Sequence, residues 1–155
     1  MSATTALRAA VASGDLAEIE RLVVADKRSV RALLGLTYHA DPALRDTAAT
    51  GLALAARHHP DLVAEVVRRL VWAMNDESGT NAVQGPAVMR RIAEVAPALL
   101  LPVVPDLLRL TSDPGLRDEL VAVVRRVAEL QPGEAAMAVR TGIGHCVKGG
   151  AAHAV

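Results

Sequence analysis

The sequence predicts an all-α fold built from repeated helical hairpins, and a recurring helix-opening signal is the main reason. Asp41, Gly85 and Asp113 each stand directly before a proline, and an apolar residue and an arginine follow within five positions. Proline is tolerated at the first helical position because its missing N–H would be unbonded there, and a preceding Asp caps the new helix. The copies lie 44 and 28 residues apart, so each unit has about the length of one helical hairpin.

Composition supports the same fold class. Hydrophobic residues make up 52% of the 155 residues, yet the chain has no Phe, one Tyr and one Trp. Such a content of Ala, Leu and Val suits close packing of helices better than it suits sheets, which favour aromatic residues. The length predicts one domain, which we place at 1–142, followed by a flexible tail at 143–155 that has no helical period.

Caps and apolar spacing define the helices in order. The expected helices cover 4–12, 15–25, 28–39, 41–57, 61–75, 86–96, 103–111 and 134–140, with one more that begins at 113. Gly14 ends the first of them, and Asp15 with Glu18 forms a capping box for the second. Asp41 begins the fourth, and Asp61 begins the fifth after two histidines and a proline. Paired in order, these helices form about four hairpins behind a short N-terminal capping helix.

Two surfaces of these helices lead to separate expectations. The small residues Ala48, Gly51 and Ala55 share a face of the fourth helix, which leaves open whether this face packs within one chain or between subunits of a homo-oligomer. On the expected helix that begins at 113, Arg125 and Glu129 are spaced as an i,i+4 ion pair on the solvent side.

Charge and cysteine content exclude several classes of partner and location. The 17 Lys and Arg residues balance 17 Asp and Glu residues, so no global field would attract a nucleic acid. The most apolar window, 95–104, is short and contains two prolines, so we expect no membrane-spanning segment. The single Cys146 cannot form an intramolecular disulfide, and the first residues do not form a signal peptide. A cytoplasmic location is therefore expected.

Hairpins of this length that open with Asp-Pro-x-Leu-Arg resemble HEAT repeats, a family of stacked helix pairs. The resemblance covers about 15–140, and the copy at 85–90 departs from it because it lacks the aspartate. The segment 72–79 (Trp-Ala-Met-Asn-Asp-Glu-Ser-Gly) is also similar to a segment of small bacterial HEAT proteins. The resemblance implies a right-handed, armadillo-like α-solenoid in which the second helix of each pair lines the concave side. Here the lining helices would be 28–39, 61–76, 103–111 and 134–140.

One lining helix, 61–76, carries the best candidate for a binding site. Its apolar stripe leaves an aromatic residue, arginines and polar residues together on the other side. Such a set can hold a partner or ligand by stacking, charge and hydrogen bonds. The candidate residues, with two from the end of the preceding lining helix and one from the following loop, are Tyr38, His39, Arg68, Arg69, Trp72, Asn75, Asp76 and Glu77. The alternative is that Trp72 packs against the next hairpin while Asn75 and Asp76 cap the helix end.

The histidines and the cysteine provide no convincing catalytic or metal site. His58 and His59 end a helix, where exposed carbonyls favour a cation, and adjacent residues point to different helix faces. His145, Cys146 and His153 have the chemistry of metal ligands or of a nucleophile but no matched partners. We therefore expect no metal and no cofactor, and we assign no catalytic residue.

Two hypotheses for the function follow, from different classes. The first is an interaction scaffold that binds a protein partner through its concave face. The second is a small-ligand protein or enzyme with a pocket between 28–39 and 61–76 near Trp72, covered by the loop 77–84. Binding of nucleic acid ranks third because the neutral chain lacks a basic stripe with interleaved aromatic residues.

Overall fold

The computed structural model describes residues 2–76, 84–131 and 133, and these residues contain helices and no strand. The helices are α1 (Ala3–Ser13), α2 (Leu16–Ala25), α3 (Ser29–Leu36), α4 (Pro42–Ala55), α5 (Pro60–Asn75), α6 (Gly85–Val95), α7 (Val104–Leu110) and α8 (Arg117–Leu130), with the 3₁₀ helices η2 (Pro97–Leu99) and η3 (Leu101–Val103) before α7. The all-α prediction is confirmed for this part of the chain. The expected helix 134–140 and tail 143–155 lie outside the described residues, as does Glu77.

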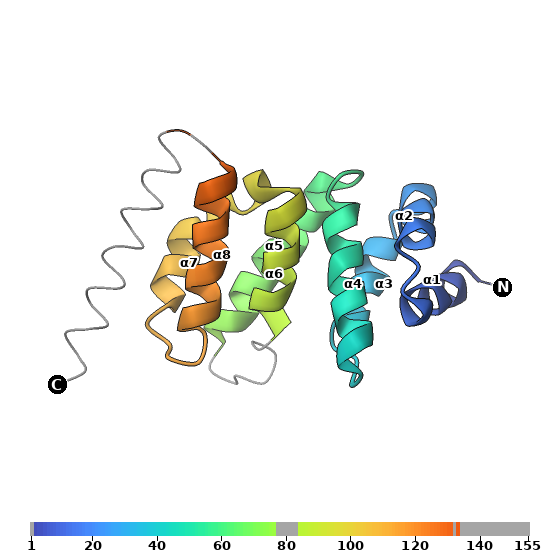
Figure 1. Cartoon of the computed structure of the whole chain (residues 1–155), viewed down its shortest axis with the longest axis horizontal. Helices are drawn as coiled ribbons and strands as arrows, with labels where there is room; N and C mark the ends of the chain where they lie inside the picture. The colour runs from blue at the N-terminus through green and yellow to red at the C-terminus, as the bar shows by residue number, and fades with distance from the viewer. Residues whose placement is uncertain (1, 77–83, 132, 134–155) are drawn as a thin grey trace.

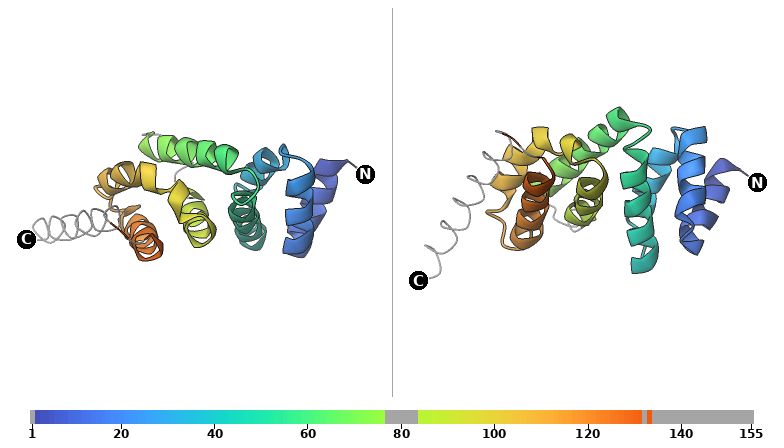
Figure 2. Two further views of the ribbon diagram at one scale, coloured as in Figure 1. Left: turned by 90° about the horizontal axis from the view of Figure 1, so that it is seen from above. Right: turned by 45° about the horizontal axis from the view of Figure 1, so that its top comes forward.

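The helices are arranged in two layers (Figure 1, Figure 2). In one layer α2, α4, α6 and α8 contact one another in sequence, and in the other α1, α3, α5 and α7 do so. Figure 1 shows that α4, α6 and α8 run in the same direction. Helix α5 crosses this layer at a steep angle and contacts both α4 and α6 (Figure 2). None of the described helices is long and apolar enough to cross a membrane.

Short polar side chains begin several helices as the sequence predicts. The carboxylate of Asp15 accepts a hydrogen bond from the N–H of Glu18 at 3.0 Å, and Asp41 accepts one from Ala43 at 3.0 Å. The capping box at Asp15 is only half formed, because the N–H of Asp15 already donates to the carbonyl of Ala10. Gly14 ends α1 with a φ of +71°, a left-handed conformation that favours glycine.

The third copy of the opening signal does not begin a helix at its proline. The carboxylate of Asp113 accepts from the N–H of Gly115 at 2.8 Å, which forms a local turn, and α8 begins only at Arg117. The prediction of a helix start at Asp113 is therefore wrong by about one turn. Asp41 accepts the equivalent bond from Ala43 and does begin its helix, so the bond alone does not decide the start; the third copy differs in carrying Gly115, a poor helix former, where the first has Ala43.

The small-residue face of α4 packs within the chain. Ala48, Gly51 and Ala55 are all buried, and a Cβ atom on Gly51 would lie 3.0 Å from Leu33 Cδ2 and 3.1 Å from Ile19 Cγ2. This answers the question that the sequence left open. Glycine at position 51 lets α4 approach α2 and α3 closely, so this face is part of the core rather than a surface for a second subunit.

Candidate functional site

Trp72 is the most exposed of the large hydrophobic side chains among the described residues. It lies on α5 and is 71% exposed. Arg68 and Arg69 precede it by about one helical turn and are also exposed. Arg68 makes no hydrogen bond or ion pair with the described residues. Trp72 therefore does not pack against the next hairpin, which was the alternative weighed above.

The polar residues at the end of α5 have structural partners. The side-chain amide of Asn75 donates to the carbonyl of Val71 at 3.1 Å, one turn back along the helix, and Asp76 is the residue that ends α5. This bond returns to a carbonyl within the helix, so Asn75 has a local structural partner, while the cap position is that of Asp76. Asn75 and Asp76 thus frame the end of the helix beside Trp72.

Tyr38 and His39 lie in a different place from Trp72. They line a cavity of about 570 Å³ with Arg8 from α1 and Leu44 from α4, and Tyr38 is 46% exposed. The Nδ1 atom of His39 accepts a hydrogen bond from the N–H of Asp41 at 3.0 Å, which fixes the turn into α4. Their cavity lies on the α1 side of α3, so these two residues do not share a pocket with the α5 residues.

A second hollow, the α3–α5 groove, lies between the two helices where the sequence analysis placed a pocket. It has a volume of about 240 Å³. Its floor is apolar and consists of Val30, Leu34, Leu62 and Val66, and its rim consists of Lys27, Arg28, Arg31, Glu65 and Arg69. Of the predicted site residues only Arg69 lines this groove, and Trp72 lies three positions beyond it on α5.

Two of the four basic residues on the rim already have acidic partners. Arg28 contacts Asp26 at 3.0 Å, and the hydrogen bond from this guanidinium lowers the pKa of the Asp26 carboxyl. Arg69 contacts Glu65 at a longer distance of 3.5 Å. Lys27 and Arg31 make no ion pair with any described residue. The groove therefore combines an apolar floor with unneutralised positive charge.

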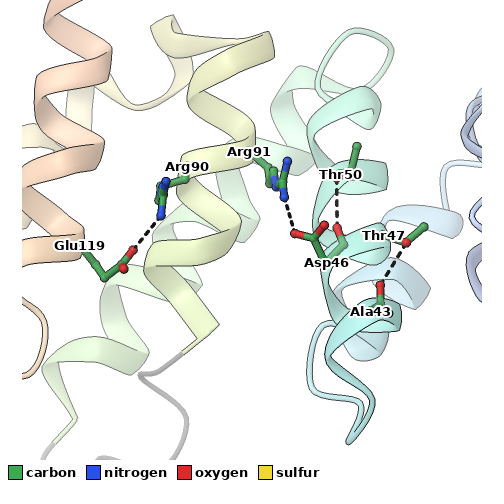
Figure 3. Close-up of polar contacts among 7 residues, drawn as sticks. All are labelled: Ala43, Asp46, Thr47, Thr50, Arg90, Arg91 and Glu119. Atoms are coloured by element: carbon green, nitrogen blue, oxygen red, sulfur yellow. Dashed lines mark hydrogen bonds and ion pairs between the residues drawn. The ribbon is translucent and has the colours of Figure 1, made fainter.

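The opposite layer differs, because three of its arginines are paired with acids from a neighbouring helix. Arg91 on α6 contacts Asp46 on α4, and Arg90 contacts Glu119 on α8 at 3.3 Å (Figure 3). Arg126 on α8 makes a two-pronged contact with Glu94 on α6, at 2.7 and 2.9 Å. These pairs join adjacent helices of this layer.

The expected ion pair between Arg125 and Glu129 does not form. Glu129 instead contacts Arg126 at 3.0 Å, in an i,i+3 pair. Arg125 has no ion pair with a described residue, although it lies on the same helix. The reason is that Arg126 is already oriented along α8 by Glu94, which places its guanidinium within reach of Glu129.

The two adjacent histidines connect α4 to α2. His58 Nε2 lies 2.9 Å from Glu20 Oε1, and His59 Nε2 lies 2.9 Å from the carbonyl oxygen of Val23. His58 and His59 therefore follow the end of α4, as expected, and also hold that end against α2. Within residues 2–76, 84–131 and 133, no group of three or more His, Cys, Asp or Glu residues is arranged to hold a metal ion. His145, Cys146 and His153 lie outside these residues.

Sequence reasoning missed most of the α3–α5 groove. Leu62 and Val66 belong to the apolar stripe of α5 and were counted as core, although both also line the groove. The cluster Lys27, Arg28 and Arg31 beside Val30 is the signal that could have indicated it. The chain is neutral overall, so the net positive charge of this cluster can be recognised only when the ion pairs of the other charged residues are known.

Comparison with known proteins leaves the family open. No family model, no curated protein and no solved structure matches this chain.

Proposed function

We propose that this chain is a cytoplasmic HEAT-like interaction module that binds a protein partner on the surface formed by α3 and α5, with Trp72 at its centre. The two layers of helices and the recurring Asp-Pro signal support a solenoid of repeated hairpins. Helices α3 and α5 correspond to two of the helices that the HEAT resemblance assigns to the concave, partner-binding side.

The exposure of Trp72 is the observation that carries this proposal. A chain with only two aromatic residues leaves one of them 71% exposed, beside two arginines. Tryptophan and arginine dominate the energetics of protein interfaces, because they bury a large area and still form directional contacts. An exposed indole contributes nothing to the core of the isolated chain, so a partner surface gives it a role.

The test is partner capture by wild type, Trp72→Ala and Val24→Ala from a lysate of the native host. Val24 on α2 is the matched control, since it is also a large exposed apolar side chain, at 56%. We expect Trp72→Ala to lose a stoichiometric partner and to keep its helical circular dichroism signal, while Val24→Ala keeps both. A partner that Trp72→Ala retains would contradict the proposal, and a loss of helix content would show that Trp72 stabilises the fold.

The larger cavity favours one alternative, a site for a small ligand. The cavity of about 570 Å³ places Tyr38 and His39 beside Arg8, which has no ion pair among the described residues. A native mass spectrum of the protein purified gently from its host distinguishes the two functions. A stoichiometric small added mass that Tyr38→Ala removes would support the ligand site, and a bare monomer or a captured protein subunit would favour the interaction module.

A further inference from the structure

We propose that the α3–α5 groove binds an acidic, amphipathic segment of the partner protein, with its apolar side chains on the groove floor and its carboxylates against Lys27 and Arg31. This inference rests on the proposed function and adds the chemistry of the partner to it. It also uses a part of the surface that the exposure of Trp72 alone does not identify.

The floor of the groove suits aliphatic side chains. Val30 and Val66 form its deepest part, at 3% and 6% exposure, and Leu34 and Leu62 are half-buried beside them. The α5 side of the groove extends from Leu62 to Arg69, which corresponds to about 10 Å along the helix at 1.5 Å per residue. This length accommodates about two turns of a bound helix, whose apolar residues at i, i+3, i+4 and i+7 form one stripe.

The rim determines the sign of the partner's charge. Lys27 and Arg31 both line the groove and make no ion pair with the described residues, so they offer two cations to a partner. Most other arginines of the described chain contact a carboxylate or a backbone carbonyl. Carboxylates on a bound segment would pair with Lys27 and Arg31 and would speed the encounter.

The shape of the groove favours a polypeptide over the other anions that share this chemistry. Pockets for small molecules usually measure about 300–1,000 Å³ and enclose most of their ligand, whereas this groove has a volume of about 240 Å³ and is only partly enclosed. Nucleic acid would leave the aliphatic floor without a contact, because its backbone presents phosphates and sugars. A segment that continued past Arg69 would also cover Trp72, three positions further along α5.

The test uses a synthetic peptide as the probe. The peptide has about 14 residues, with leucines at i, i+3, i+4 and i+7 and glutamates on its other face, and a matched peptide carries lysine at every glutamate position. Binding is followed by the anisotropy of the labelled peptide and by the fluorescence of Trp72, the single tryptophan in the chain. We expect the acidic peptide to bind and to shift the tryptophan emission to the blue, and the lysine peptide not to bind.

Variants show whether the groove is the binding site. We expect Arg31→Glu to weaken acidic-peptide binding by roughly tenfold or more, and Lys27→Glu to act in the same direction. Arg125→Glu is the matched control, since Arg125 is also an exposed, unpaired arginine but lies on α8. We expect Arg125→Glu to bind like wild type. Circular dichroism of each variant confirms that it is folded, and Lys27→Glu replaces Arg31→Glu if the latter is not.

Three outcomes would overturn the inference. The first is equal binding of the two peptides, or no binding of the acidic one. The second is binding that Arg31→Glu and Lys27→Glu leave unchanged. The third is that decanoate or vesicles of anionic phospholipid bind and the peptide does not, which would assign the groove to a fatty anion or a membrane surface. A native partner that Trp72→Ala loses but Arg31→Glu retains would overturn this inference alone and leave the proposed function intact.

Discussion

The arginine of the repeated Asp-Pro motif acts on backbone carbonyls at the end of the preceding helix or in the turn that follows it. Arg45 donates to the carbonyls of His39 and Ala40 at 3.0 and 3.1 Å, and Arg117 donates to the carbonyl of Thr111 at 2.8 Å. Carbonyls at the end of a helix have no partner within the helix, so a guanidinium there satisfies an acceptor that would otherwise need water. The motif thus closes the turn between two helices, which explains why it predicts structure and not activity.

We expect Arg117→Ala to lower the free energy of unfolding by about 1–2 kcal/mol, because it removes a charge-assisted hydrogen bond at a half-buried position. Urea titration followed by circular dichroism measures the change. The control is Arg125→Ala, which removes an arginine without a partner among the described residues and should change stability by less than about 0.5 kcal/mol. Equal effects of the two substitutions would show that the bond to Thr111 contributes nothing to stability.

Substitution by alanine should have opposite effects on stability at two helical glycines, because Gly51 lies at a helix interface and Gly35 faces open space. Alanine has a higher helix propensity than glycine by about 1 kcal/mol. No heavy atom would lie within 4 Å of a Cβ on Gly35, so we expect Gly35→Ala to raise the free energy of unfolding by about 0.5–1 kcal/mol. A Cβ on Gly51 would meet the fully buried Leu33 and Ile19, so we expect Gly51→Ala to lower it by about 1 kcal/mol. Thermal or urea unfolding compares the pair, and stabilisation by Gly51→Ala would mean that the interface of α4 with α2 and α3 can expand.

Helices could be predicted from the sequence where local signals decide them, and the site could be predicted only in part. Caps such as Asp15 and Asp41 act within three residues, so their helices begin where expected. The site depends instead on how α3 and α5 cross, which local spacing does not define. Trp72 could be identified because it lies on the side of α5 that the apolar stripe leaves free. Tyr38 was expected beside Trp72, but it lies on the α1 side of α3.

Across the described part of the molecule, the ion pairs that join different helices lie in one layer, although unpaired arginines occur in both layers. The layer with α4, α6 and α8 joins its helices through ion pairs, whereas the α3–α5 groove keeps Lys27 and Arg31 without partners among the described residues. Net charge therefore says little about what such a chain can bind. Ion pairs between helices thus stabilise one layer of the described chain, and the α3–α5 groove in the other layer offers unpaired cations to a partner.

The pair of Glu94 and Arg126 allows this cohesion to be tested by pH. The hydrogen bond from the Arg126 guanidinium lowers the pKa of Glu94 below its ordinary value of about 4.3. Because the folded pKa lies below the unfolded one, the pair contributes stability above about pH 4.3 and loses that contribution as the pH falls through the folded pKa. We expect the free energy of unfolding to decrease between about pH 6 and pH 3, and to decrease less steeply in Glu94→Gln.

Urea titrations over this pH range give the slope for each variant. Arg126→Gln removes the same pair from the other side, so it should flatten the slope as Glu94→Gln does, and the double variant should add little. Some slope should persist in all of them, because Glu18 and Asp26 also have lowered pKa values through Arg21 and Arg28. A wild-type slope in Glu94→Gln would mean that the pair of Glu94 and Arg126 does not stabilise the contact between α6 and α8 in solution.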